Sequence, residues 1–360
     1  MTILPYLSAT RGDVQFIEDT GNRFPSYIKF IHELFGSNDI KVIFIRSPAC
    51  KTEYITIDGE KHFIIDRQSD LYFNALAYPT IFSQDEKSEN TERLFGALCY
   101  VAANELFHCG RPLLAQKTLE AYGRGYLYNT PVDFHGEMCR LHFSLFHEWG
   151  HILVNDNNEA ATDVLTATDQ VFSEHVDELT QKACAEGNYA KNIYYRTRYS
   201  DQFKSNNRTE CAVDLLAALR MKEMLDGDIM LSACTGGMPI FLQKSLITIH
   251  QHEMIEDIKG IVKRAITGAS YAERDQSILI QRMRVTRQIF NRLMVDLYGI
   301  DRAQSFHSDF YSYLVRVDQP CKKELYEQLH RFIAANRDKF NEQLEPESNS
   351  ERCLELFDWV

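Results

Sequence analysis

The spacing of apolar residues predicts a small β-sheet in the first third of the chain. Residues 41–45 (KVIFI), 53–57 (EYITI) and 62–66 (HFIID) are short runs rich in β-branched and aromatic side chains, as is typical of strands. Asp58-Gly59 separates the last two runs and predicts a tight hairpin turn, because both residue types accept the left-handed backbone that such turns require.

Beyond the predicted sheet the pattern changes, and apolar residues recur every three or four positions as in buried or amphipathic helices. Glycine and proline predict a loop over 110–125, and the CTGGMP run at 234–239 predicts a break between helices. The chain is therefore expected to be α+β and mostly helical. The predicted helices cover about 24–35, 91–109, 136–154, 208–225, 240–265, 274–299 and 320–343.

Composition and charge narrow the class of protein. The net charge of −12 over 360 residues gives no general footprint for nucleic acid, so no nucleic-acid partner is expected. No apolar run approaches the roughly 20 residues of a membrane-spanning helix, and the N-terminus lacks the pattern of a signal peptide. The nine cysteines are scattered without a CxxC pair, as in reduced cytosolic proteins. We therefore expect a cytoplasmic protein with no integral membrane segment.

The main chemical motif is HEWGH at 147–151, inside the predicted helix 136–154. Residues i and i+4 share a helix face, so His147 and His151 can bind one metal ion. Glu148 then lies beside the ion, where it can take a proton from a zinc-bound water. Gly150 permits close approach of another element. The alternative is a core helix with two hydrogen-bonded histidines.

Catalytic zinc commonly has three protein ligands, so one more is expected. The extended pattern HExxHxxGxxH fails, because positions 154 and 157 hold Val and Asn. The favoured third ligand is Glu210 in TECAVDLLAALR, since Asp214 lies one turn further on the same helix face and can hold a histidine N–H. The alternatives left open are Glu159, Glu174 and Glu178.

HEWGH followed by ECAVD resembles the gluzincin group of zinc metallopeptidases. The resemblance covers about 140–225, and the spacing between its two motifs is long. It implies that His147, His151 and Glu210 bind Zn²⁺, that Glu148 is the general base, and that Asp214 orients a histidine. More loosely, the chain is similar in motif, size and compartment to Lit-type phage-exclusion proteases.

This resemblance implies a zincin-like catalytic core at 91–235, between an N-terminal region with the small sheet (1–90) and a helical C-terminal region (236–345) with a tail (346–360). The expected activity is hydrolysis of a peptide bond in a specific intracellular protein. The substrate peptide would lie along an edge strand, either 53–57 or 62–66, and IYYRTRY at 193–199 offers donors for the transition state. The alternative function is a non-catalytic zinc protein that binds a protein partner through its C-terminal helices.

Overall fold

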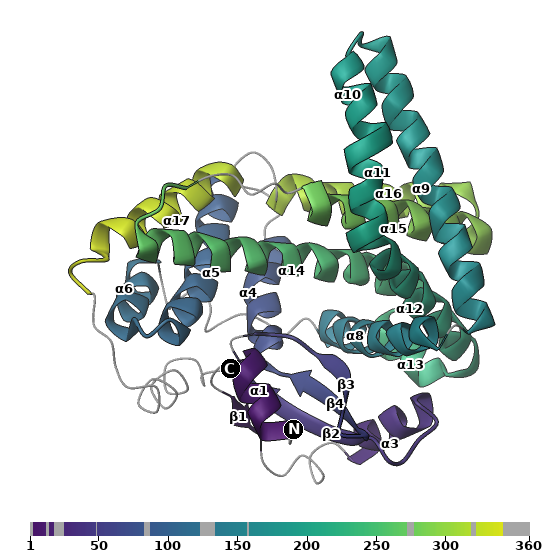
Figure 1. Ribbon diagram of the computed structural model, residues 1–360, viewed down its shortest axis with the longest axis horizontal. Helices are drawn as coiled ribbons and strands as arrows, with labels where there is room; N and C mark the ends of the chain where they lie inside the picture. Colours follow the sequence, from purple (N-terminus) through teal and green to yellow (C-terminus); the bar gives the residue numbers. More distant parts are fainter. Residues whose placement is uncertain are drawn as a thin grey trace. The chain divides into compact units, whose positions relative to one another are not determined.

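The computed structural model confirms the α+β class, with many helices and one small sheet (Figure 1). The described residues are 3–11, 14–17, 25–47, 49–82, 87–122, 134–156, 158–271, 277–317 and 322–340.

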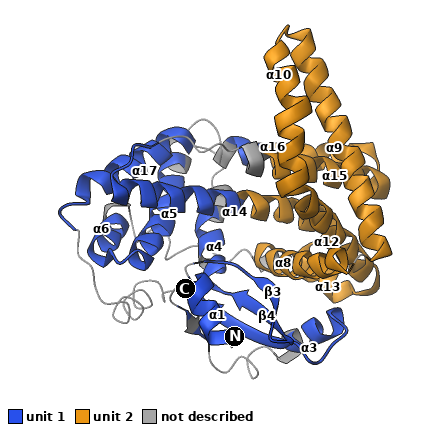
Figure 2. Ribbon diagram, in the orientation of Figure 1, with its two compact units in different colours: residues 1–133, 251–272, 312–360 blue, residues 134–250, 273–311 orange. Residues whose placement is uncertain are grey.

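The chain forms two compact units, each made of separate segments (Figure 2). Unit 1 comprises 1–133, 251–272 and 312–360, and unit 2 comprises 134–250 and 273–311. The expected boundaries after residues 90 and 235 are not among these divisions. Helix α14 (Met238–Thr267) is continuous and supplies residues to both units. The predicted tail at 346–360 lies outside the described residues.

Unit 1 contains the predicted sheet, whose strand order is β1-β2-β4-β3. The three predicted strands are present, and two-residue β1 adds a fourth. Strand β2 is parallel to β4, and β3 is antiparallel to β4. The strands are β1 (Gln15–Phe16), β2 (Lys41–Arg46), β3 (Glu53–Ile57) and β4 (Glu60–Asp66).

The hairpin turn between β3 and β4 is where it was predicted. Asp58 and Gly59 have φ of 51° and 84°, as a type I′ turn requires. Because β4 pairs on both sides, the expectation that 62–66 forms an edge strand is wrong; of those two segments, the edge is 53–57.

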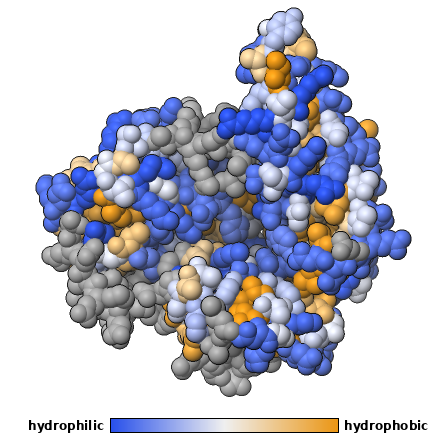
Figure 3. All heavy atoms as spheres, viewed as in Figure 1, coloured by the Kyte–Doolittle hydropathy of each residue, from blue (hydrophilic) through white to orange (hydrophobic). Residues whose placement is uncertain are grey.

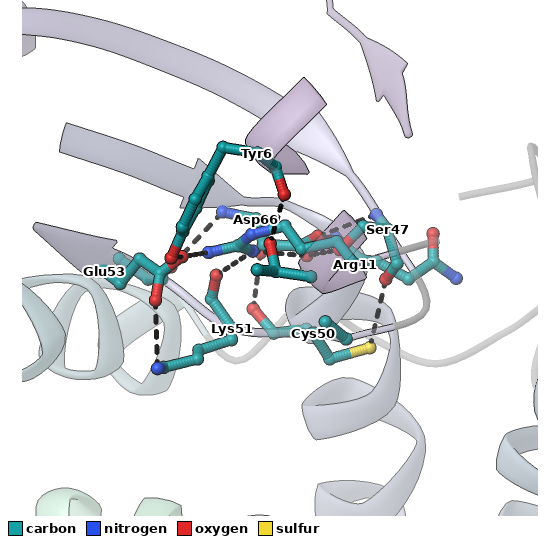
Figure 4. Close-up of polar contacts among 12 residues, drawn as sticks. Tyr6, Arg11, Ser47, Cys50, Lys51, Glu53 and Asp66 are labelled. Carbon is teal, nitrogen blue, oxygen red and sulfur yellow. Dashed lines mark hydrogen bonds and ion pairs between the residues drawn. The ribbon is translucent and has the colours of Figure 1, made fainter. Parts of the chain in front are cut away.

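A buried ionic network attaches helix α1 (Ile3–Arg11) to this sheet (Figure 4). The Arg11 guanidinium contacts the carboxylates of Glu53 and Asp66 and the carbonyl oxygen of Lys51. Asp66 also accepts from the backbone N–H of Ser47 at 3.1 Å. Burial raises the pKa of Asp66 to about 6, although its hydrogen bonds and Arg11 act in the opposite direction. These ion pairs and hydrogen bonds join α1 to β3 and β4, so the network is structural.

The other helices of unit 1 include one that the sequence pattern did not predict. Helix α6 begins at Pro112, inside the expected loop 110–125, because proline is well suited to the first position of a helix. The unit also contains α3 (Pro25–Leu34), α4 (Gln68–Phe82), α5 (Lys87–His108), α17 (Lys322–Asn336) and the second part of α14.

Unit 2 consists of helices, and the long helix α9 (Glu159–Ala185) was not predicted. The Asn158 side chain caps it by accepting from the N–H of Ala160 at 3.0 Å. The chain then returns beside α9 through α10 (Figure 1). The remaining elements are α8 (Phe134–Asn155), α10 (Tyr189–Tyr194), π-helix η1 (Tyr195–Tyr199), α11 (Ser200–Gln202), π-helix η2 (Phe203–Asn207), α12 (Arg208–Gly227), α13 (Ile229–Thr235), α15 (Ser277–Tyr298) and α16 (Ile300–Val317), whose last residues belong to unit 1.

Hydrophilic residues cover much of the visible surface of the α9–α10 hairpin (Figure 3). Two large apolar side chains on α10 are exceptions: Tyr189 is 75% exposed and Ile193 is 63% exposed. In the described part of the chain, no helix has the length and apolar character needed to cross a membrane.

Close packing of α8 against α12 determines the geometry of the predicted site. A Cβ atom added to Gly150 would lie 2.4 Å from Cγ1 of Val213, so a side chain at this position would not fit without movement. The predicted role of Gly150, close approach of another element, is confirmed, and the element is α12. Val213 is fully buried and lies between Glu210 and Asp214 in the sequence.

Candidate metal centre

The two histidines of HEWGH lie one turn apart on α8 and direct their rings to the same point. Their Nε2 atoms are 3.2 Å apart, and the ring centroids are 4.8 Å apart. Side chains at i and i+4 of a helix meet in this way when their rotamers converge. The spacing of HEWGH is therefore sufficient to explain the pair.

Helix α12 brings Glu210 to the same point from its first turn. One carboxylate oxygen of Glu210 lies 3.3 Å from Nε2 of His147, and the other lies 3.5 Å from Nε2 of His151. All three residues are half-buried, and one donor atom from each lies within 4.8 Å of the other two. The group could therefore hold a metal ion.

The donor set and its spacing fit zinc. Zinc binds histidine nitrogen and carboxylate oxygen at roughly 2.0–2.2 Å in a tetrahedron, whose vertices are then about 3.3–3.5 Å apart. The Nε2 atoms of His147 and His151, 3.2 Å apart, agree with this spacing, and each has a different oxygen of Glu210 near it, at 3.3 and 3.5 Å. Three protein ligands leave the fourth tetrahedral position open, as in catalytic sites.

Asp214 holds the ring of His147 from the side opposite the ligand atoms. Its carboxylate lies 3.0 Å from Nδ1 of His147, and its side chain is completely buried. An acceptor at Nδ1 places the proton there and leaves Nε2 available for a metal, and it also fixes the orientation of the ring. The pairing is the one expected from the i to i+4 relation between Glu210 and Asp214.

Helix α15 supplies two polar side chains that the sequence reasoning missed. Arg282 contacts both oxygens of Asp214, at 2.7 and 3.0 Å, and one oxygen of Glu210 at 2.9 Å. Thr286, one turn later, donates its hydroxyl to Asp214 at 3.0 Å. Arg282 thus offsets part of the charge of two carboxylates and contacts one oxygen of Glu210, which leaves the other for a metal.

The pKa values reflect this arrangement. Burial opposes the charged form of each group, but hydrogen bonds with Asp214 and Glu210 outweigh it and raise the pKa of His147 to about 9. The same contacts and Arg282 lower the pKa of Glu210 to about 2 and that of Asp214 further. Burial and the neighbouring His147 lower the pKa of His151 to about 4. Without metal, a protonated His147 therefore sits between two carboxylates, and metal binding must displace its proton.

The chain matches no protein-family model, no curated protein and no solved structure. Inference about the site therefore rests on its geometry.

The alternative third ligands lie elsewhere on α9. Glu174 forms an ion pair with Arg292 of α15, and Glu159 lies in the first turn of α9. Glu178 is exposed, and within the described residues none of the three belongs to a group that could hold a metal. The geometry therefore selects Glu210 from the candidates.

The expected donors in IYYRTRY have other contacts. The Tyr199 hydroxyl lies 3.2 Å from Nε2 of His175 on α9, and its ring stacks near Phe172. Arg196 lines a groove between α9 and the helical segment that follows α10. The contacts described for these two side chains therefore lie away from the metal ligands.

Proposed function

We propose that this protein is a zinc-dependent metallopeptidase with Glu148 as its general base. The observation that carries the proposal is the convergence of His147, His151 and Glu210, whose donor atoms lie within 4.8 Å of one another, with Asp214 behind His147. A purely structural zinc site is usually closed by four protein ligands, whereas three support a catalytic site with room for water.

The metal supplies Lewis acidity, which polarises a peptide carbonyl and lowers the pKa of water. The protein residues supply orientation and proton transfer. Asp214 fixes the ring of His147, and Arg282 fixes Asp214 and Glu210 together. This arrangement keeps the ligands in place before substrate arrives, so little reorganisation is needed during the reaction.

Glu148 follows His147 directly on α8 and is half-buried. A position one residue after the first ligand is rotated by about 100° around the helix, and on this ground we assign its carboxylate a place beside the metal group. There it accepts a proton from the attacking water and delivers it to the departing amine nitrogen. The substrate is a peptide bond in an intracellular protein, and no nucleic acid is involved.

The test replaces Glu148 with Gln, which keeps the size of the side chain and removes the base. We expect the variant to bind one zinc ion per chain and to unfold at the wild-type temperature, while cleavage of a peptide library, followed by mass spectrometry, falls by several orders of magnitude. Glu137→Gln is the matched control, because Glu137 lies in the first turn of the same helix, about 16 Å before Glu148.

Loss of zinc in Glu148→Gln would make Glu148 a ligand and contradict its role as base. A zinc-loaded wild-type protein that cleaves no peptide would instead support the alternative, a zinc-containing protein that only binds its partner.

A further inference from the structure

Helix α15 has a second functional face, away from the metal ligands. Arg282 and Thr286 lie four residues apart and contact the carboxylates of the metal centre. Arg284 is two residues from each of them, so it is rotated by about 200° around the helix. On that side Arg284 interacts electrostatically with the Tyr199 hydroxyl.

Arg287 lies one turn after Arg284 and has no partner among the described residues. Its Nε atom is buried without a hydrogen bond, and it has no ion pair with any described carboxylate. The other arginines of the region differ in this respect. Arg208 forms two hydrogen bonds of 2.7 Å with Asp169, and Arg292 pairs with Glu174. Arg287 is half-buried, so water screens its charge only in part, and no described carboxylate compensates that charge.

The side chains described around Arg284 and Arg287 carry positive or neutral groups. His175 is held by the Tyr199 hydroxyl and by the Gln288 amide, at 3.2 and 3.1 Å, so its ring is fixed beside the arginines. Burial and then the charge of Arg284 lower the pKa of Arg287. Burial and then the charge of Arg287 lower the pKa of His307 on α16. No described carboxylate contributes to either shift, so the positive potential here is not balanced.

The groove between α9 and the segment after α10 does not have an unbalanced positive charge of this kind. It has a volume of about 610 Å³, and its cations Arg196, Lys204 and Arg208 lie beside the carboxylates of Asp169 and Asp177. Two acids among three cations leave little net charge, so this groove is a weaker candidate for an anion.

We propose that Arg284 and Arg287, flanked by Tyr199 and His307, form a binding site for the phosphate group of a small molecule. The planar guanidinium presents paired donors that match two phosphate oxygens. Two arginines one turn apart, with a hydroxyl and an imidazole beside them, provide donors for the three oxygens of a phosphate monoester. The site is separate from the metal centre, and the proposal is independent of the proposed peptidase activity.

The test is calorimetric titration of chelator-treated, metal-free protein with inorganic phosphate, glycerol 3-phosphate and succinate at constant ionic strength. Removing metal matters because phosphate would otherwise also bind zinc. We expect one saturable site for inorganic phosphate or for the monoester, with succinate weaker. Preference for the monoester identifies an organic phosphate as the ligand, and equal binding identifies the free ion.

Arg287→Gln and Arg284→Gln should each weaken phosphate binding by at least tenfold, whereas Arg292→Gln on the same helix should leave it unchanged. In phosphate-free buffer, Arg287→Gln should unfold at the wild-type temperature or higher, because it relieves repulsion. This separates a binding role from a structural one. The proposal is overturned if wild-type protein shows no saturable binding, if succinate binds best, or if Arg292→Gln weakens binding as much as Arg287→Gln.

Discussion

Replacement of Gly150 by alanine tests whether helix packing sets the geometry of the metal centre. The added Cβ would lie 2.4 Å from Cγ1 of Val213, whereas carbon atoms in contact lie at about 3.5–4.0 Å. The overlap is therefore at least about 1 Å. Val213 is buried and β-branched, so its side chain has little freedom to rotate within a helix. The strain must then move α12 away from α8.

Two free-energy terms nearly cancel in this variant. Alanine favours the helix over glycine by about 1 kcal/mol, and overpacking a core costs about 1–3 kcal/mol. The free energy of unfolding should therefore fall by only about 0–2 kcal/mol. Metal binding is more sensitive, because ligand distances tolerate only about 0.2 Å and Glu210 moves with α12. We expect zinc affinity to fall by at least about tenfold, since displacements near 1 Å exceed that tolerance.

Competition with a chromogenic chelator measures the affinity, and thermal unfolding measures the stability. Gly227→Ala is the control for helix propensity, because a Cβ there meets no atom within 4 Å. The double variant Gly150→Ala/Val213→Ala should recover zinc affinity, since the other neighbours of the new Cβ lie at an acceptable 3.4 Å. Wild-type affinity in Gly150→Ala, or no recovery in the double variant, would refute the reasoning.

Two further predictions concern polar contacts. Asp214→Asn should lower zinc affinity by about 10–100-fold in the same chelator assay. The variant weakens the hydrogen bond to His147 and removes the negative charge that pairs with Arg282. Unchanged zinc affinity would exclude an orienting role for Asp214. For His175, burial and two nearby arginines lower the folded-state pKa from 6.5 to about 4. Its stabilising contribution should be complete above pH 6.5 and lost as the pH falls toward 4, by at most about 3 kcal/mol. Urea unfolding across this range, in phosphate-free buffer, should show a shallower slope for His175→Gln than for wild type, and parallel slopes would contradict the assignment.

The candidate metal ligands were predictable because their geometry is local. The step from i to i+4 puts His147 beside His151, and the same step puts Asp214 beside Glu210. Joining the two pairs required only the chemistry of zinc, which needs a third ligand. The strands at 53–57 and 62–66 and the hairpin turn between them were likewise set by short-range preferences.

The contribution of α15 to the site was not predictable, because it depends on contacts between helices that are distant in the sequence. Residues 277–292 contain four arginines and no acidic residue, and nothing in the pattern distinguishes Arg282, which is at the metal centre, from Arg284. The rotation of α15 about its own axis relative to α12 determines which arginine faces the metal centre, and that rotation depends on tertiary packing. Helix α9 was missed because Thr168, His175 and Thr180 occupy buried positions, which weakens the apolar periodicity.

The division of unit 2 into two chain segments affects the order in which a ribosome can complete the metal centre. His147, Glu210 and Asp214 emerge well before Arg282, which is 68 residues beyond Asp214. At roughly 5–20 residues per second, synthesis of that interval takes about 3–14 s. During this time the nascent chain has the candidate metal ligands and Asp214 but lacks the guanidinium that pairs with the carboxylates of Glu210 and Asp214. We therefore expect metal to be captured first by an electronegative, incomplete site, and the arrival of α15 to lock it in place.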